Sequence, residues 1–145
     1  LMCDLLRLLR HQPEVGLPLL VYGPSGGGKT SLLRALLHHF QIPTAHIDCI
    51  ASPNDRSLYE SALNQLAQHT PCATNHYTNW SHCDTPATFI GGLRQLAYAR
   101  GGRVCLVLDK ADRLIKRVSL LQTLLALPQH ASCGQTGETA QAVLY

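Results

Sequence analysis

The sequence predicts an α/β fold in which a parallel sheet carries helices on both faces. A continuous apolar run of strand length, as expected for a strand buried on both faces, occurs at residues 17–22, and residues 44–49 and 103–109 are also predicted as strands, the latter buried. Segments with leucine and alanine at helical spacing alternate with these strands. The chain has 145 residues, 46% of them apolar and 14% charged, which is enough for one domain with a hydrophobic core.

The first half of the chain begins with a short amphipathic pattern, "MCDLLRLLRH", which Pro13 and Gly16 end. The apolar run 17–22 is the first predicted strand. A glycine-rich segment then leads into a predicted helix over residues 29–40, whose leucines gather on one side. The second strand, 44–49, follows Pro43.

The next helical pattern covers residues 55–69, with Asp55 as its expected N-cap, and the polar residues 70–84 predict a loop. Thr85 is the expected N-cap of a further helix that has Pro86 at its first position. Two glycines, Gly91 and Gly92, are expected to weaken the middle of this helix.

The third strand, 103–109, is followed by a predicted helix over residues 119–127 that Pro128 closes. A flexible stretch over 131–141 and the start of a fourth strand at 142–145 complete the chain. We therefore divide the domain into a leading helix and linker (1–16), a core (17–127) and a final segment (128–145) that is flexible and then begins a strand.

Composition limits the class of protein without deciding it. The six cysteines form no C-x-x-C pair, which predicts reduced thiols and an intracellular protein. The formal charge of +3 permits contact with nucleic acid but does not argue for it. No apolar run reaches the roughly 18 residues that span a bilayer, so no membrane partner is expected. No secretory leader is visible, and because the sequence starts at Leu1 and not at a methionine, we expect it to be a fragment of a longer protein.

Residues 23–30, "GPSGGGKT", fit the pattern G-x-x-x-x-G-K-[ST] and lie between a predicted strand and a predicted helix. Glycines let backbone N–H groups approach a triphosphate, and the helix start adds its positive end. Lys29 is expected to neutralise the β- and γ-phosphates of ATP, and the Thr30 hydroxyl to bind Mg²⁺. A plain glycine turn is the alternative. The expected nucleotide contacts are Gly23, Pro24, Ser25, Gly26, Gly27, Gly28, Lys29, Thr30 and Ser31.

Asp109 ends the strand "VCLVLD" and is the expected second magnesium ligand, because ligands bind at the carboxyl edge of open α/β sheets. An Asp that only caps the following turn is the alternative. The next residue is Lys110, where hydrolysing ATPases of this kind place a catalytic Glu. An ammonium cannot accept a proton from water at neutral pH, so we expect weak or absent hydrolysis and no catalytic residue. Asp112 is the substitute base to consider.

The segments "GPSGGGKT", "LVLDKADRL", "HIDC" and "RSLYESALNQL" together resemble the AAA+ domains of the origin recognition complex subunit 5 family, over about residues 17–127. The resemblance implies a P-loop NTPase fold of the three-layer α/β/α type, truncated here before the sensor strand and the lid. In this fold the sensor strand lies between the two strands that carry the motifs. A sheet that lacks it exposes strand edges, which makes stability in isolation doubtful.

The resemblance also implies a place in a nuclear complex. Members of this family bind ATP structurally, between neighbouring subunits of an assembly that marks replication origins. It therefore implies ATP and Mg²⁺ as cofactors, other origin recognition complex subunits as partners, origin DNA reached through the assembly, and the nucleus as location. An active loader or regulatory ATPase, a small-molecule kinase and an interaction module that binds no nucleotide are the alternatives.

Two further groups of residues have side chains that could bind a ligand. Cys72, His76, His82 and Cys83 have the residue types of a zinc site, but their spacing favours a solvated loop. The basic residues Lys110, Arg113, Lys116 and Arg117 predict a solvated helix face, with contact to DNA or to a neighbouring subunit as the alternative.

Overall fold

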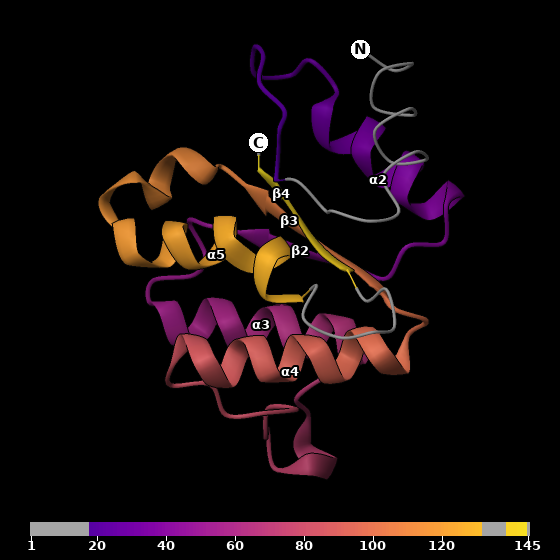
Figure 1. Ribbon diagram of the computed structural model, residues 1–145, viewed down its shortest axis with the longest axis vertical. Helices are drawn as coiled ribbons and strands as arrows, with labels where there is room; N and C mark the ends of the chain where they lie inside the picture. The colour runs from indigo at the N-terminus through magenta and orange to yellow at the C-terminus, as the bar shows by residue number, and fades with distance from the viewer. Residues whose placement is uncertain (1–17, 132–138, 145) are drawn as a thin grey trace.

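A computed structural model of the chain describes residues 18–131 and 139–144. Four strands form one sheet in the order β1-β4-β3-β2, and every neighbouring pair is parallel (Figure 1). Their bounds are Leu19–Leu20 for β1, Thr44–Asp48 for β2, Arg103–Asp109 for β3 and Thr139–Leu144 for β4. The predicted parallel α/β fold is therefore confirmed.

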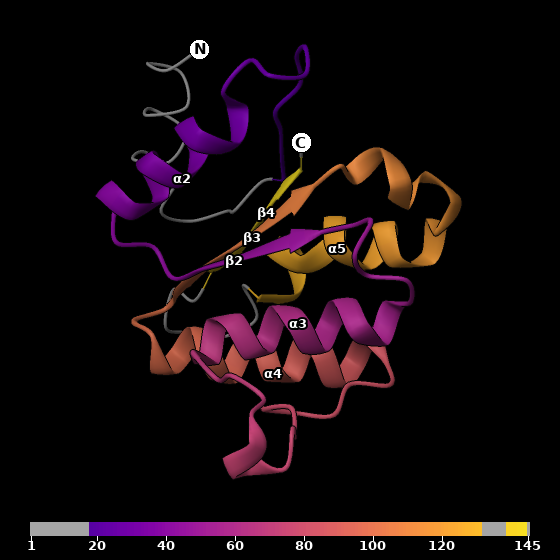
Figure 2. The same ribbon diagram turned by 180° about the vertical axis from the view of Figure 1, so that it is seen from behind.

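Helices cover both faces of the sheet, which makes three layers. Helix α2 (Lys29–His39) lies on one face, and α3 (Asp55–Ala67), α4 (Pro86–Ala99) and α5 (Val118–Ala131) lie on the other (Figures 1 and 2). Alternate residues of β3 show the division. Val104, Leu106 and Leu108 join the cluster of α3, α4 and α5, whereas Cys105 and Val107 join that of α2.

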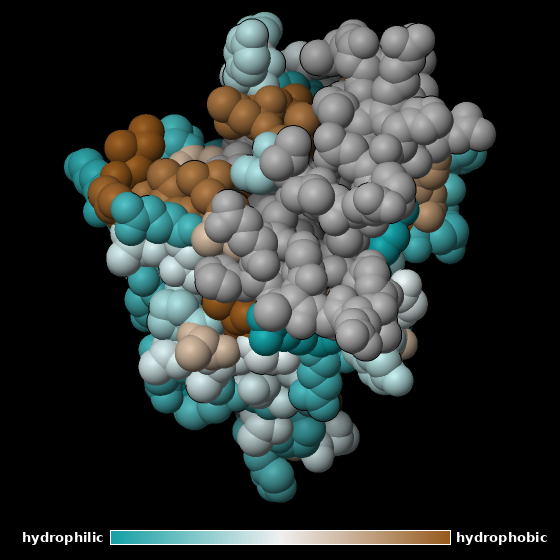
Figure 3. Space-filling model, viewed as in Figure 1, coloured by the Kyte–Doolittle hydropathy of each residue, from teal (hydrophilic) through white to brown (hydrophobic). Residues whose placement is uncertain are grey.

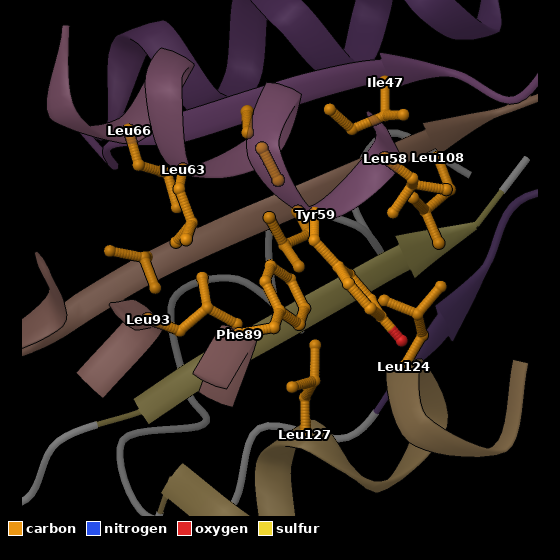
Figure 4. Packing of buried hydrophobic residues seen from close by; sticks show 14 of the residues in the cluster. Ile47, Leu58, Tyr59, Leu63, Leu66, Phe89, Leu93, Leu108, Leu124 and Leu127 are labelled. Carbon is orange, nitrogen blue, oxygen red and sulfur yellow. The ribbon is translucent and has the colours of Figure 1, made fainter. Parts of the chain in front are cut away.

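The larger hydrophobic core lies between the sheet and the helices α3, α4 and α5. Tyr59 of α3 and Phe89 of α4 stack with their ring centroids 4.4 Å apart, and leucines of all three helices surround them (Figure 4). Apolar side chains on neighbouring turns thus fix how the helices pack. On the opposite face of the sheet, Leu33, Leu36 and Leu37 of α2 are buried, as their spacing predicted.

Side chains at the helix starts explain where α3 and α4 begin. The carboxamide of Asn54 accepts a hydrogen bond from the Ser57 amide at 2.7 Å, so Asn54 is the N-cap of α3. The prediction of Asp55 was wrong by one residue, because Asp55 is already helical and pairs with Arg117. Thr85 caps α4 as predicted, with Pro86 in its first turn.

Further boundaries differ from the predictions, by one or two residues at the ends of α2, β2 and α3 and at the start of α5, and more notably at three places. Strand β1 is shorter than 17–22, although Val21 is still buried. Helix α5 continues through Pro128 to Ala131, so the predicted end at residue 127 is wrong. A proline removes one backbone hydrogen-bond donor, and the loss of this single donor leaves the helix intact. Strand β4 begins at Thr139, three residues before the predicted start, so residues 139–141 are not a flexible stretch. The predicted helix at 2–11 lies outside the described residues.

Strand β4 takes the place between β1 and β3 that the resemblance assigned to the sensor strand. The sheet therefore does not stop before this position. Six residues of β4 pair with β3, from Arg103↔Thr139 to Leu108↔Leu144.

Among the described residues β1 and β2 are the two edge strands of the sheet, and α3 covers part of the edge at β2. The Gln65 carboxamide accepts a hydrogen bond from the His46 amide at 2.8 Å and donates one to the His46 carbonyl at 2.9 Å. The Gln65 side chain thus forms hydrogen bonds with the N–H and C=O groups of His46, which point away from β3 in the middle of the strand. The edge at β2 is less open than an incomplete sheet suggested.

The loop over residues 70–84 projects from the α3–α4 end but is held by a chain of polar contacts (Figure 2). Asn64 of α3 donates to Asn79 at 2.8 Å, and Asn79 donates to the buried Glu60 at 2.7 Å. Arg56 connects the same Glu60 to Asp84, with 3.0 Å for each ion pair. The loop is therefore anchored along one face of α3.

In the part of the chain that is described, no helix is both long and apolar enough to cross a membrane.

Candidate functional site

The Gly-rich loop, residues 23–30, connects β1 to α2 at the carboxyl end of the sheet. Gly26 and Gly28 have φ values of +78° and +72°, which L side chains rarely adopt. A Cβ at either position would meet no atom within 4 Å, so both residues border open space. Left-handed backbone and open space are the conditions in which a phosphate chain can approach the amides of such a loop.

The start of α2 supplies the second feature of this loop. Gly28 is the N-cap of the helix and has no side chain to accept hydrogen bonds from the first amides, and the first turn contains no acidic residue. The positive end of α2 therefore has no acidic side chain within its own first turn. The Lys29 ammonium donates to the carbonyls of Gly23 and Pro24 at 2.9 and 2.8 Å, so it folds back over the loop.

Asp109 lies across from this loop, at the end of β3, and both line one cleft of about 810 Å³. The cleft also receives Thr30, Ser31 and, from the turn after β3, Lys110 and Asp112. All the predicted contact residues except Pro24 are among the residues that line it; the Pro24 carbonyl instead accepts from Lys29. The structure thus brings together the two motifs that the sequence separates by about 80 residues.

The apolar part of the cleft wall comes from Leu20, Val21, Ile115 and Leu121. Leu20 and Ile115 are each 66% exposed, and Figure 3 shows apolar surface beside β1 and over the region of η2 (Ala111–Lys116) and α5. A cleft with one polar, glycine-lined side and one apolar side suits a ligand that joins phosphates to a flat base.

Lys110 does not face an acid of the cleft but an acid of the neighbouring strand. Its ammonium donates to Oδ2 of Asp48 at 2.9 Å, and its backbone is left-handed, with φ +57°. Asp48 and Asp109 are register partners at the ends of β2 and β3. The hydrogen bond to Asp48 raises the pKa of Lys110, and the same bond lowers the pKa of Asp48. Lys110 therefore stays protonated and cannot act as a general base.

Asp48 was not among the predicted site residues. Asp48 is the last residue of β2 and lies one residue before the end of "HIDC", as Asp109 is the last residue of β3. This parallel is the signal that could have identified it. Its Oδ1 atom accepts from the Ile50 amide at 2.9 Å, which fixes the carboxylate at the start of the turn after β2.

The basic residues after β3 do not form one solvated face. Arg117 donates to Asp55 and to the Ser52 carbonyl, which joins the end of η2 to the start of α3. Arg113 lies 3.6 Å from the exposed Asp112, and Lys116 is exposed. The prediction of a solvated face is wrong for the partly buried Arg117, whereas Lys110 is exposed as predicted. Each of the two has an acidic partner 62 residues away in the sequence.

The cysteines and histidines considered as zinc ligands have different surroundings and do not share one site. Cys83 is buried in the larger core, Cys72 contacts the Thr74 hydroxyl at 2.9 Å, and His82 lies 3.2 Å from Glu60. Within residues 18–131 and 139–144, no group of three or more His, Cys, Asp or Glu side chains is arranged to hold a metal. A magnesium site at Thr30 and Asp109 is of a different kind, since Mg²⁺ takes most of its oxygen ligands from phosphates and water.

A parallel sheet with a Gly-rich loop after β1 and an acid at the end of β3 defines a P-loop nucleotide-binding fold. The chain belongs to the AAA domain family, which matches residues 14–140. Within this family it resembles origin recognition complex subunit 5.

The similarity to that subunit covers about two thirds of the chain. The chain is 36% identical to origin of replication complex subunit 5 of Arabidopsis thaliana over 92 residues, and 29% identical to origin recognition complex subunit 5 of Homo sapiens over 97 residues. These alignments cover 63% and 65% of the chain but 17% and 22% of the relatives. It is also 28% identical to the arginine transport ATP-binding protein ArtP of Escherichia coli over 142 residues, which cover 88% of the chain and 52% of that relative.

Proposed function

We propose that the chain binds ATP with Mg²⁺ in the cleft between the Gly-rich loop and Asp109. The observation that carries this proposal is the meeting of Lys29, Thr30 and Asp109 around one cleft at the end of the sheet. The amides of residues 23–30 would hold the phosphates, and the Lys29 ammonium would leave the loop carbonyls to neutralise them. Thr30 and Asp109 would hold the magnesium ion, which neutralises charge on the phosphates when bound.

We infer that the nucleotide has a mainly structural role. Hydrolysis needs a base that orients and deprotonates water, and the residue after Asp109 is a lysine with a raised pKa. A bound ATP would then stabilise the folded domain and its contacts instead of being consumed. A ligand present at a hundred times its dissociation constant adds about 2.7 kcal/mol to the free energy of unfolding.

The similarity to origin recognition complex subunit 5 supports a place for this domain in such a complex. We propose that its partners are other subunits of that complex, that it meets origin DNA through the assembly, and that it acts in the nucleus. These proposals concern the whole protein, because the matched part of the chain spans only 17% and 22% of the length of these relatives.

Calorimetry with ATP and Mg²⁺ on the full-length protein tests the nucleotide site. We expect Mg²⁺-dependent binding in the parent protein, loss of binding in Lys29→Ala and unchanged binding in Lys116→Gln, which removes an exposed ammonium elsewhere. Absence of Mg²⁺-dependent heat in the parent would contradict the proposal.

An active ATPase is the second candidate, because Asp112 lines the same cleft as Lys29 and Asp109. A steady-state phosphate-release assay separates the two functions. Slow or absent release is expected for the structural role. Robust release that disappears in Asp112→Ala would establish the enzyme instead.

A further inference from the structure

The ion pair of Lys110 and Asp48 lies at the wall of the cleft. Lys110 lines the cleft together with Lys29 and Asp109, whereas Asp48 is not among the described residues that line it. The Lys110 ammonium, on a flexible stem of four carbons, is thus drawn from the site toward the neighbouring strand.

This pair is weakly held. The two side chains are 45% and 43% exposed, and exposed ion pairs stabilise a fold only slightly. Asp48 keeps its second contact, the amide of Ile50, if Lys110 leaves. Since both groups stay open to water, their separation buries no unpaired charge.

We propose that Lys110 leaves Asp48 for the terminal phosphate of a bound nucleoside triphosphate, which makes the site prefer a triphosphate over a diphosphate. The inference rests on the proposed nucleotide-binding function of the cleft. A terminal phosphate carries more negative charge than one carboxylate, and lysine binds phosphate as a point charge. A diphosphate lacks this group, so Lys110 stays with Asp48.

In this arrangement Lys110 is a specificity-determining residue and Asp48 is its competitor. The proposal separates the two ammonium groups of the cleft by task. Lys29 comes from the loop itself and binds the phosphates of a diphosphate or a triphosphate. Lys110 binds only the terminal phosphate of a triphosphate. The proposal thus assigns a role in nucleotide binding to Lys110, which stands where a hydrolysing ATPase has a catalytic Glu.

The test compares ATP and ADP affinities, measured with Mg²⁺ by equilibrium titration on the full-length protein. Lys110→Gln is expected to weaken ATP binding about tenfold and to change ADP binding less than about twofold. Lys110→Arg, which keeps the charge, is expected to retain the preference for ATP. Asp48→Asn frees Lys110, so ATP binding is expected to stay the same or to tighten. Lys116→Gln is the control for loss of one positive charge.

Lys110→Asn guards against loss of the fold, because asparagine accepts the left-handed backbone at this position. It is expected to repeat the result of Lys110→Gln. An equal effect on ATP and ADP, or no effect, would overturn the inference while leaving Lys29-dependent binding intact. Weaker ATP binding in Asp48→Asn would overturn it too, because the pair would then shape the site instead of competing with it. A parent protein that binds neither nucleotide would overturn both proposals.

Discussion

A Cβ atom built at Gly92 in the middle of α4 would lie 2.9 Å from Cδ1 of Leu63 on α3. Leu63 is fully buried and has little room to move, and the partly buried Trp80 approaches the same position at 3.5 Å. Gly92 is therefore the point where α3 and α4 approach closely. The expectation that both glycines weaken this helix considers the backbone alone and omits the packing that needs Gly92.

Gly91 and Gly92 provide a matched pair of substitutions. A Cβ at Gly91 meets nothing within 4 Å, so Gly91→Ala is expected to raise the free energy of unfolding by about 0.5–1 kcal/mol through helix propensity. The same change at Gly92 adds a clash in a filled core, and overpacking of this kind costs about 1–3 kcal/mol. Urea unfolding of both variants measures the difference. Equal stabilisation by both would contradict the close approach of the helices.

Asn54 is expected to contribute to the stability of α3 through its side chain. Asn54→Ala removes the acceptor for the Ser57 amide and is expected to cost about 1 kcal/mol of unfolding free energy. Asn54→Asp keeps an acceptor at this position and serves as the control, with little expected change. Chemical denaturation curves of the two variants provide the comparison. A loss of the same size in both would show that the cap is not the cause.

The stability of the domain should depend on pH through His46. Burial lowers the pKa of this imidazole, the nearby Arg34 lowers it further, and Asp109 opposes both. The unfolded chain, with an imidazole pKa of about 6.5, then binds protons more readily than the folded one. The contribution of the neutral ring is complete above about pH 6.5, falls as the pH drops below this value, and levels off below the folded pKa.

Replacement of His46 tests this dependence. His46→Gln is expected to flatten the pH dependence of the unfolding free energy on the acid side of neutrality. His39→Gln is the matched control, because it makes the same replacement at an exposed imidazole. An unchanged slope in His46→Gln would assign the pH dependence to other groups.

The cysteines should differ strongly in reactivity. The hydrogen bond from Thr74 lowers the pKa of the partly exposed Cys72, whereas burial raises the pKa of Cys49 to about 11 and that of Cys105 to about 12. Because the thiolate is the nucleophile, alkylation of the folded protein should modify Cys72 well before the other two. Peptide mass spectrometry gives the rate at each site. Thr74→Val should slow Cys72 alone, and similar rates at all three would contradict the environments described here.

Much of the site could be predicted because its signals are local. The Gly-rich loop and the apolar run that ends at Asp109 are each contiguous in the sequence, and parallel topology brings their carboxyl ends to one edge of the sheet. No local signal exists for the Lys110–Asp48 contact, which joins residues 62 positions apart and depends on the register of β2 with β3.

Two further features were hidden for related reasons. The first residues of β4, "TAQA", are not continuously apolar, so a strand beside β3 in the sheet has the composition of a loop. The polar loop over 70–84 is held by Asn64 and Glu60 of α3. The sequence pattern predicted only the apolar face of this helix and not these polar contacts. In both cases the tertiary partner, and not the local sequence, decides the structure.

The contacts of Gln65 bear on how this domain behaves at high concentration. Strands at the border of a sheet invite a second chain to extend it, which leads to aggregates. Here a carboxamide from α3 already occupies the donor and acceptor that an incoming strand would need at His46. Self-association along this border has to displace a helix side chain first, so the domain carries its own protection against fibre-like growth.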